Sequence, residues 1–241
     1  MINIIDVYKS FGKLQILKGI NMEVKKNKVH SILGASGSGK STLLQCINGL
    51  EKIQKGRILV DGIEVGDKKT NLNFLRTKIG IVFQQFNVFP HLTTLENVTL
   101  ALKVVLKKRN KDAKEIALQQ LEKIGLSDKI NTYPSKLSGG QQQRLAIARA
   151  LAMSPSYMLF DEITSALDPM LVGEVLDALR YLKNDGMTMM IVTHEIRFAK
   201  EVSDKISFLH EGVVIESGAP KDIIDNPKET ETIKFLERSL K

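Results

Sequence analysis

The chain is poor in the residues that stabilise small secreted proteins. It has one cysteine, Cys46, no tryptophan and an aromatic content of only 5% among 241 residues. A single cysteine excludes an internal disulfide, and this favours a reducing compartment such as the cytosol. The core must therefore rely on aliphatic side chains, and the hydrophobic content of 43% is enough for one large α/β domain or two small ones.

Long hydrophobic runs are also missing. The longest apolar stretch, 98–106, contains Lys103 and is too short for a bilayer, which takes about 20 apolar residues. The first seven residues are too few for a secretory signal, and they include Asn3 and Asp6. We therefore expect any membrane association to depend on a partner or on the protein surface.

Acidic residues are fewer than basic ones, 27 against 35, which gives a formal net charge of +8. A basic surface can bind nucleic acid or an anionic membrane, but it is as often only a lysine-rich exterior. The densest basic run, 107–111, lies between two helical patterns, where an exposed turn is the commoner explanation. Charge alone leaves the three interpretations open.

Against these absences stands one continuous motif. Residues 34–42 read Gly-Ala-Ser-Gly-Ser-Gly-Lys-Ser-Thr and match the phosphate-binding pattern G-x-x-x-x-G-K-[ST]. A buried-strand pattern over 29–33 precedes the motif and a helical pattern over 42–47 follows it, as a phosphate-binding loop requires. An accidental glycine-rich loop would lack this context, so the sequence predicts a nucleotide phosphate site.

Each residue type in this loop has a physical reason. Glycines allow positive φ, so that backbone N–H groups turn inward on phosphate oxygens. Lys40 supplies a mobile positive charge for the β- and γ-phosphates, and the Ser41 hydroxyl is a hard oxygen ligand suited to Mg²⁺. The predicted phosphate-binding residues are Gly34, Ser36, Gly37, Ser38, Gly39, Lys40, Ser41 and Thr42.

The rest of the chain alternates between strand and helix patterns. Short strand patterns over 2–7, 20–24 and 56–62 predict an antiparallel β unit around the loop. Buried-strand patterns over 79–83, 157–160 and 188–193, separated by helices, predict a parallel α/β sheet with its site at the carboxyl ends of the strands. The segment 86–135 is expected to form a helical insertion, and 223–240 an amphipathic helix.

The pentapeptide Leu137-Ser138-Gly139-Gly140-Gln141 separates this chain from other phosphate-loop proteins. With the loop, it resembles the nucleotide-binding subunits of ATP-binding-cassette (ABC) transporters, whose signature is LSGGQ. The resemblance covers essentially the whole chain, whereas the loop alone would also admit kinases, GTPases and helicases. It implies an α/β, P-loop NTPase fold as one ABC ATPase domain over 1–241. The core and an antiparallel β subdomain would take 1–85 and 136–241, and a helical subdomain about 86–135.

The resemblance implies ATP and Mg²⁺ as cofactors and gives roles to further residues. Asp161 is implied as a Mg²⁺ ligand, and Glu162 as the residue that polarises the attacking water. Gln84 matches the Q-loop glutamine, which reaches Mg²⁺ or water, and His194 matches the switch histidine on the γ-phosphate. The implied catalytic residues are Lys40, Gln84, Glu162 and His194, and the implied metal ligands are Ser41, Gln84 and Asp161. Further nucleotide contacts are implied for Phe11 (stacking on adenine), Ser138, Gly139, Gly140, Gln141 and Asp168 (D-loop).

Several of these residues also have a plain structural explanation. Adjacent acids at a strand end often form a solvated turn, a lone histidine is usually on the surface, and an aromatic before a turn often packs in the core. Their order within the matched family favours the functional role. One departure is Ile163, where many relatives have proline; it makes the segment beside Glu162 less rigid and removes no catalytic group.

The resemblance also implies partners. It predicts a homodimer that closes head-to-tail on ATP, with each nucleotide between the Lys40 cradle of one copy and the signature of the other. It predicts two transmembrane permease subunits, an extracytoplasmic solute-binding protein as an indirect partner, and a peripheral place on the cytoplasmic face of the membrane. Segments 9–20, 46–48, 83–87 and 226–236 look like bacterial polar amino-acid importers. Another small-solute or lipoprotein transporter is the alternative.

A nucleic-acid-acting ABC ATPase is the other alternative, which the charge invites. Chromosome and repair members divide their ATPase halves with long coiled coils, and translation members carry two cassettes. This chain has one cassette and no sustained heptads, so we expect no nucleic-acid partner. The apolar Phe86, Val88 and Phe89 predict either a docking groove for a short permease helix or packing of the insertion onto the core.

Overall fold

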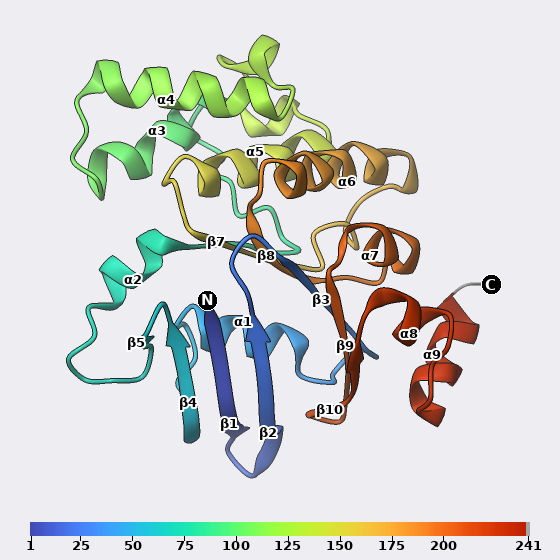
Figure 1. Ribbon diagram of the computed structural model, residues 1–241. Coiled ribbons are helices and arrows are strands. Elements are labelled where there is room, and N and C mark those ends of the chain that lie inside the picture. Colours follow the sequence, from blue (N-terminus) through green and yellow to red (C-terminus); the bar gives the residue numbers. More distant parts are fainter. Residues whose placement is uncertain (240–241) are drawn as a thin grey trace.

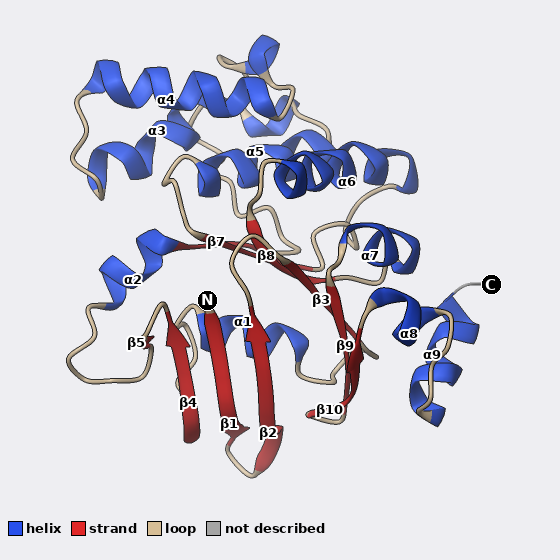
Figure 2. Cartoon of the chain, viewed as in Figure 1, coloured by secondary structure: helices blue, strands red, loops and turns tan. Residues whose placement is uncertain are grey.

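Two sheets organise the chain in the computed structural model, which describes residues 1–239 (Figure 1). The smaller sheet is antiparallel, with the strand order β2-β1-β4-β5. The larger sheet has the order β10-β9-β3-β8-β7-β6, and only its edge strand β10 pairs antiparallel (Figure 2). The expected α/β fold with an antiparallel β unit is confirmed.

The strands are β1 (Ile2–Phe11), β2 (Leu14–Val24), β3 (Val29–Leu33), β4 (Lys55–Val60), β5 (Ile63–Glu64), β6 (Ile79–Val82), β7 (Tyr157–Asp161), β8 (Thr188–Val192), β9 (Lys205–His210) and β10 (Val213–Gly218). The α-helices are α1 (Lys40–Ile47), α2 (Leu72–Lys78), α3 (Thr94–Val104), α4 (Asn110–Lys123), α5 (Gly139–Leu151), α6 (Pro169–Asn184), α7 (Ile196–Val202), α8 (Pro220–Ile224) and α9 (Thr230–Ser239). Two 3-10 turns, η1 (Ser127–Lys129) and η2 (Pro134–Lys136), connect α4 to α5.

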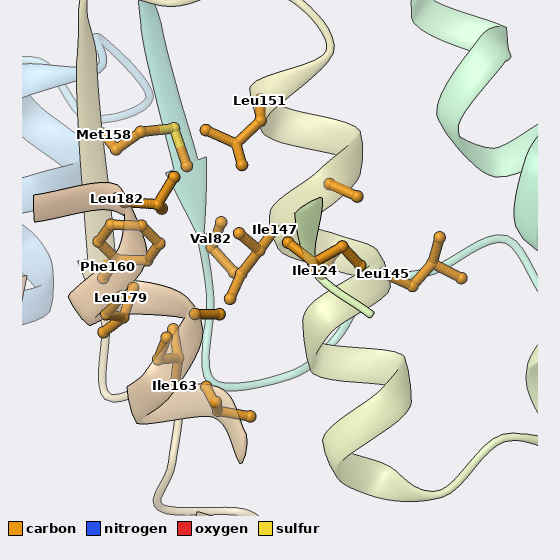
Figure 3. Packing of buried hydrophobic residues seen from close by; sticks show 14 of the residues in the cluster. Val82, Ile124, Leu145, Ile147, Leu151, Met158, Phe160, Ile163, Leu179 and Leu182 are labelled. Atoms are coloured by element: carbon orange, nitrogen blue, oxygen red, sulfur yellow. The ribbon is translucent and has the colours of Figure 1, made fainter. Parts of the chain in front are cut away.

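Aliphatic side chains fill the space on both faces of the larger sheet. Helix α1 shares one hydrophobic cluster with the antiparallel sheet and with one face of β7 and β8. The other face packs against α5 and α6, where Met158 and Phe160 meet Ile147 and Leu179 (Figure 3). All residues of β3, β7 and β8 are buried, because both faces of these strands are covered. The central strands are therefore rigid supports for the loops at their ends.

The helical insertion is present as α3 and α4, which lie above the larger sheet and pack on α5 (Figure 1). Helix α4 ends at Lys123, and Gly125 follows it with a φ of +67°, while the N–H of Leu126 donates to the carbonyl of Leu121 at 2.8 Å. The insertion shares its hydrophobic cluster with α5 and α6, so the helical layer extends past residue 135. The subdomain limits remain a prediction.

The single tail helix expected over 223–240 is wrong. The segment contains two helices, α8 and α9, separated at 225–229. Pro227 has no N–H and disfavours helical geometry in the residue before it, so the chain turns there. Glu216 holds this turn by accepting hydrogen bonds from the N–H groups of Lys228 and Glu229. Leu240 lies outside the described residues.

Across residues 1–239, no helix has both the length and the apolar character that crossing a bilayer demands.

Candidate active site

The carboxyl ends of four neighbouring strands bring the predicted catalytic segments to one edge of the larger sheet. In the pairing register, Ile32 of β3 lies opposite Val192 of β8, and Val192 lies opposite Asp161 of β7. On the other side of β7, Phe160 lies opposite Val82 of β6. The phosphate-binding loop follows β3, and residues 193–194 follow β8. The acidic pair, Asp161 and Glu162, lies at the end of β7, and the Q-loop with Gln84 follows β6. The parallel topology therefore assembles them from distant parts of the sequence.

The phosphate-binding loop depends on two of its glycines in different ways. A Cβ on Gly34 would lie 2.1 Å from the carbonyl oxygen of Leu209, so no side chain fits there. Gly37 has a φ of +78°, and a Cβ on it would meet nothing within 4 Å. The loop is thus packed tightly at its base and open at its tip. The buried Ser38 hydroxyl has no hydrogen-bond partner in the described part of the chain, which fits a loop that binds an anion.

Lys40 is buried, and its Nζ lies among three acceptors. The amine donates to the carbonyl oxygens of Gly34 at 2.8 Å and Ala35 at 2.9 Å, and it lies 3.4 Å from Oε1 of Glu162. A buried cation is stable only with such partners. The lysine is thus held at the loop by backbone oxygens of the same loop, and it links the loop to the acidic pair.

Ser41 and Asp161 form the second contact between loop and acidic pair. The Ser41 hydroxyl donates to Oδ1 of Asp161 at 2.8 Å. Burial raises the pKa of the Asp161 carboxyl, and the Ser41 hydrogen bond opposes that rise. A hydroxyl and a carboxylate are the hard oxygen donors that Mg²⁺ prefers, and at nucleotide sites this ion usually takes only one or two protein ligands. Residues 1–239 contain no cluster of three or more acidic, histidine or cysteine side chains that could hold a metal ion.

Glu162 and His194 are in direct contact. Nε2 of His194 lies 3.0 Å from Oε1 of Glu162, and this hydrogen bond is the main reason why the pKa of the Glu162 carboxyl is lowered. Lys40 lowers the same pKa further. Glu162 also has a φ of +48°, which is uncommon for a residue with a side chain and marks the turn out of β7. The carboxylate is therefore ionised at neutral pH and held by two neighbours.

The other predicted residues lie apart from this cluster. Ser138 caps α5 and forms a capping box with Gln141, while Gly139 and Gly140 pack beside Leu167 and Leu171. Within 1–239, no hydrogen bond or ion pair joins this signature to the phosphate-binding loop. Asp168 caps α6 by accepting from the N–H of Met170 at 2.9 Å.

Gln84 and Phe11 are both exposed. Gln84 lies in the turn after β6, and its side chain makes no hydrogen bond to any residue of 1–239. Phe11 ends β1 and is 46% exposed as a residue, and the Lys9 Nζ lies 4.4 Å from the centroid of its ring. The hairpin that carries Phe11 continues into Ile16 and Leu17, which contact Gly39 of the phosphate-binding loop. Phe11 is thus a partly exposed aromatic, in contact with Lys9, on the hairpin beside the loop.

Two parts of this arrangement were not predicted. The Ala35 carbonyl accepts from Lys40, although an alanine in the variable part of the motif gave no signal. The direct contact between Glu162 and His194 joins residues that are 32 positions apart, and only the strand order brings them together.

A separate groove of about 640 Å³ lies between β6 and the helical layer. Phe86 and Phe89 line it, together with Val104 and Val105 at the end of α3. Val88 instead packs against the hydrophobic cluster under the insertion. Of the two alternatives, core packing is therefore the one that the contacts of the partly buried Val88 favour.

Comparisons with known proteins identify the family of this chain. Residues 17–165 match the family described as "ABC transporter". The chain is 52% identical over 240 residues to the glutamine transport ATP-binding protein GlnQ of Geobacillus stearothermophilus, covering 100% of this chain and 99% of that protein. It is also 52% identical over 241 residues to the glutamate/aspartate import ATP-binding protein GltL of Escherichia coli K12, with both chains fully covered.

Solved structures give the same result. The dimeric ATP-binding cassette MJ0796, in a post-hydrolysis state bound to ADP and Pi, matches with a TM-score of 0.81 at 39% identity, covering 91% of this chain and 99% of that one. CbiO1 from Clostridium perfringens, part of an ABC transporter complex, matches with a TM-score of 0.85 at 32% identity, covering 98% of this chain and 94% of that one. The sequence motifs, the assembled site and these similarities place the chain in the ABC transporter family, among its ATP-binding subunits.

Proposed function

We propose that this protein is the ATP-hydrolysing subunit of an ABC importer for polar amino acids. The observation that carries the proposal is the joining of Lys40, Glu162 and His194 at the phosphate-binding loop, next to the pair Ser41 and Asp161. These groups are the ones that phosphoryl transfer to water requires, namely cations for the phosphates and a carboxylate for the nucleophile.

In the proposed reaction, ATP phosphates replace the carbonyl oxygens that now hold Lys40. The backbone N–H groups of the loop and the start of α1 bind the β- and γ-phosphates, and Lys40 neutralises their charge. The Glu162 carboxylate, ionised because its pKa is lowered, orients a water molecule and accepts its proton. His194 holds this carboxylate and is placed to donate toward the γ-phosphate.

Ser41 and Asp161 would hold Mg²⁺, which when bound supplies charge stabilisation at the phosphates. The side chain that favours this assignment is Asp161, because burial raises the pKa of its carboxyl and a bound divalent cation would offset that cost. Gln84 is proposed to join this shell from the turn after β6.

The active dimer is proposed to form on ATP. The signature Ser138–Gln141 makes no bond to the loop of its own chain within the described residues, so a second copy has to supply it. The dimeric state of the MJ0796 cassette supports this arrangement. Each nucleotide would then lie between the Lys40 loop of one copy and the Ser138 signature of the other.

The transported solute is proposed from the relatives. Proteins about 50% identical over nearly their full lengths are named for glutamine, glutamate/aspartate, arginine and L-cystine transport. These solutes differ in charge but all are polar amino acids, so the class is supported and the individual solute is not. The peripheral position on the cytoplasmic face, the two permeases and the indirect solute-binding protein belong to the same proposal.

The groove beside β6 is the proposed permease contact. Phe89 and Val104 are 38% and 57% exposed and line the groove, so they offer apolar surface to a short helix of another protein. The double variant Phe89→Ser/Val104→Ser should lower amino-acid uptake while the isolated subunit keeps its ATPase activity. Val88→Ser is the matched contrast, because it should lower the melting temperature instead.

The test of the whole proposal has two steps. First, the purified protein should hydrolyse ATP only when Mg²⁺ is present. Second, co-expression with the permease and binding-protein genes next to its own gene should give ATP-dependent uptake of one of the labelled amino acids glutamine, glutamate, arginine or cystine. ATPase activity without uptake of any amino acid would retain the enzyme and reject the solute class. Retention on DNA-cellulose at physiological salt would favour the nucleic-acid alternative.

A further inference from the structure

The turn that carries Gln84 is held at both ends by helix α5. At the start of the turn, the Gln143 side-chain amide donates to the carbonyl of Phe83 at 3.2 Å. At its end, Nη1 of Arg149 donates to the carbonyl of Asn87 at 2.6 Å. Gln84 lies between these two anchors. Both donors come from one helix, so the position of the turn follows the position of α5.

The same helix begins with the signature. Ser138 is the N-cap of α5, and Gly139 and Gly140 form its first turn. A Cβ on Gly139 would lie 3.6 Å from the edge of the Phe86 ring, so the middle of the turn also packs against the first glycine of the signature. The start, the middle and the end of helix α5 therefore each contact the segment 83–87.

The Gln143 side chain costs stability where it lies. It is fully buried, and within the described residues its Oε1 has no hydrogen-bond partner. A buried acceptor without a partner is unfavourable, and an apolar side chain of the same length would avoid the loss. What the amide adds is the bond to the Q-loop backbone.

We propose that Gln143 and Arg149 are positioning residues through which α5 sets the place of Gln84. Their two hydrogen bonds fix the backbone on either side of Gln84, so that this residue is held at the sheet edge that carries Ser41 and Asp161. The inference rests on the function proposed above.

The first experiment measures ATPase kinetics and melting temperature of single variants. Gln143→Met removes the donor but keeps the length of the buried side chain. The expected result is a fall in kcat of about 10-fold to 100-fold, the range of a small misplacement of a catalytic group, with KM for ATP changed less than about twofold. The melting temperature should not fall, because the substitution also removes the unpaired oxygen.

Two further variants serve as controls. Gln142→Met makes the same change one residue earlier, where the amide donates to the Leu137 carbonyl and not to the turn, and its kcat should stay within about twofold of wild type. Arg149→Met should lower kcat, and Arg149→Lys should restore most of it, since a lysine amine can still donate to the Asn87 carbonyl. Equal kcat in wild type and Gln143→Met would overturn the proposal. A joint fall of kcat and melting temperature in Arg149→Met that Arg149→Lys does not rescue would also overturn the proposal.

The second experiment follows the turn directly. The native Cys46 is buried, so a Gln85→Cys variant presents the reactive thiol for a spin label. MgATP should change the mobility of the label, and adding Gln143→Met should remove that change. An unchanged response would reject the role of α5. If the wild-type protein does not hydrolyse ATP at all, the proposed function fails first; if it does and these variants behave as wild type, only the inference about α5 fails.

Discussion

The two glycine-containing helix starts of this molecule, at α1 and at α5, differ in how their first N–H groups are satisfied. Helix α1 follows Gly39, which has a φ of +104° and offers no side-chain cap. Helix α5 follows Ser138, whose side chain accepts from the N–H of Gln141 within a capping box. Free N–H groups at a helix start bind anions well, whereas a capping box satisfies them within the chain. The comparison teaches that α1 needs a ligand at its start, and that α5 is stable without one.

The largest effect is expected when the positive charge of Lys40 is removed from the start of the uncapped helix α1. Lys40→Met keeps the buried stem but deletes the amine that contacts both the loop and Glu162. ATP hydrolysis should fall by about 1000-fold, the upper range for losing one preorganised electrostatic group. A steady-state ATPase assay with saturating MgATP measures this. Hydrolysis at the wild-type rate would move the active site elsewhere.

The next change, at Glu162 beside Lys40, separates ATP binding from ATP hydrolysis. Glu162→Gln keeps the shape of the side chain but removes its ability to accept a proton, so hydrolysis should fall by about 100-fold while ATP still binds. The trapped nucleotide should hold two copies together. Size-exclusion chromatography with MgATP checks the oligomeric state. A variant that binds ATP and still elutes as a monomer would contradict the closed dimer.

The capped helix can be tested with a matched pair. Ser138→Ala and Thr93→Ala each remove a capping box, on α5 and α3 respectively, and each should cost about 1 kcal/mol of unfolding free energy. Only Ser138 belongs to the signature, so only its variant should also lose ATPase activity, by about 10-fold. Urea unfolding and ATPase assays on both proteins separate the two effects. Equal activities would mean that the signature acts only as a helix cap.

Local sequence patterns were enough for the parts of the fold that obey local rules. The strand predicted over 29–33 is confirmed as β3, and the Gly125 turn after α4 and the Asp168 cap of α6 also follow from residue type and spacing. The tail helix was wrong because its apolar spacing continues across Pro227, where the backbone cannot remain helical.

Contacts between distant segments were the part that the sequence did not reveal. The bond between His194 and Glu162 depends on β8 lying next to β7, and the bond from Gln143 to Phe83 depends on α5 lying over β6. Neither pairing is encoded by spacing along the chain. Gln142 and Gln143 look alike in sequence, yet only Gln143 reaches the Q-loop, because the helix turns it inward.

The smallest expected effect concerns the outer edge of the uncapped site. Phe11 and Leu14 lie opposite each other in the β1–β2 hairpin, and both are exposed. If the Phe11 ring stacks on adenine, Phe11→Ala should weaken ATP binding by about 1 kcal/mol, or roughly fivefold in Kd, with kcat at saturating ATP unchanged. Leu14→Ala removes apolar surface from the same hairpin and should leave Kd unchanged. Titration of ATP into each variant measures the difference. Equal Kd values for the two variants would place the adenine on another surface, because a general weakening of the hairpin affects both positions alike.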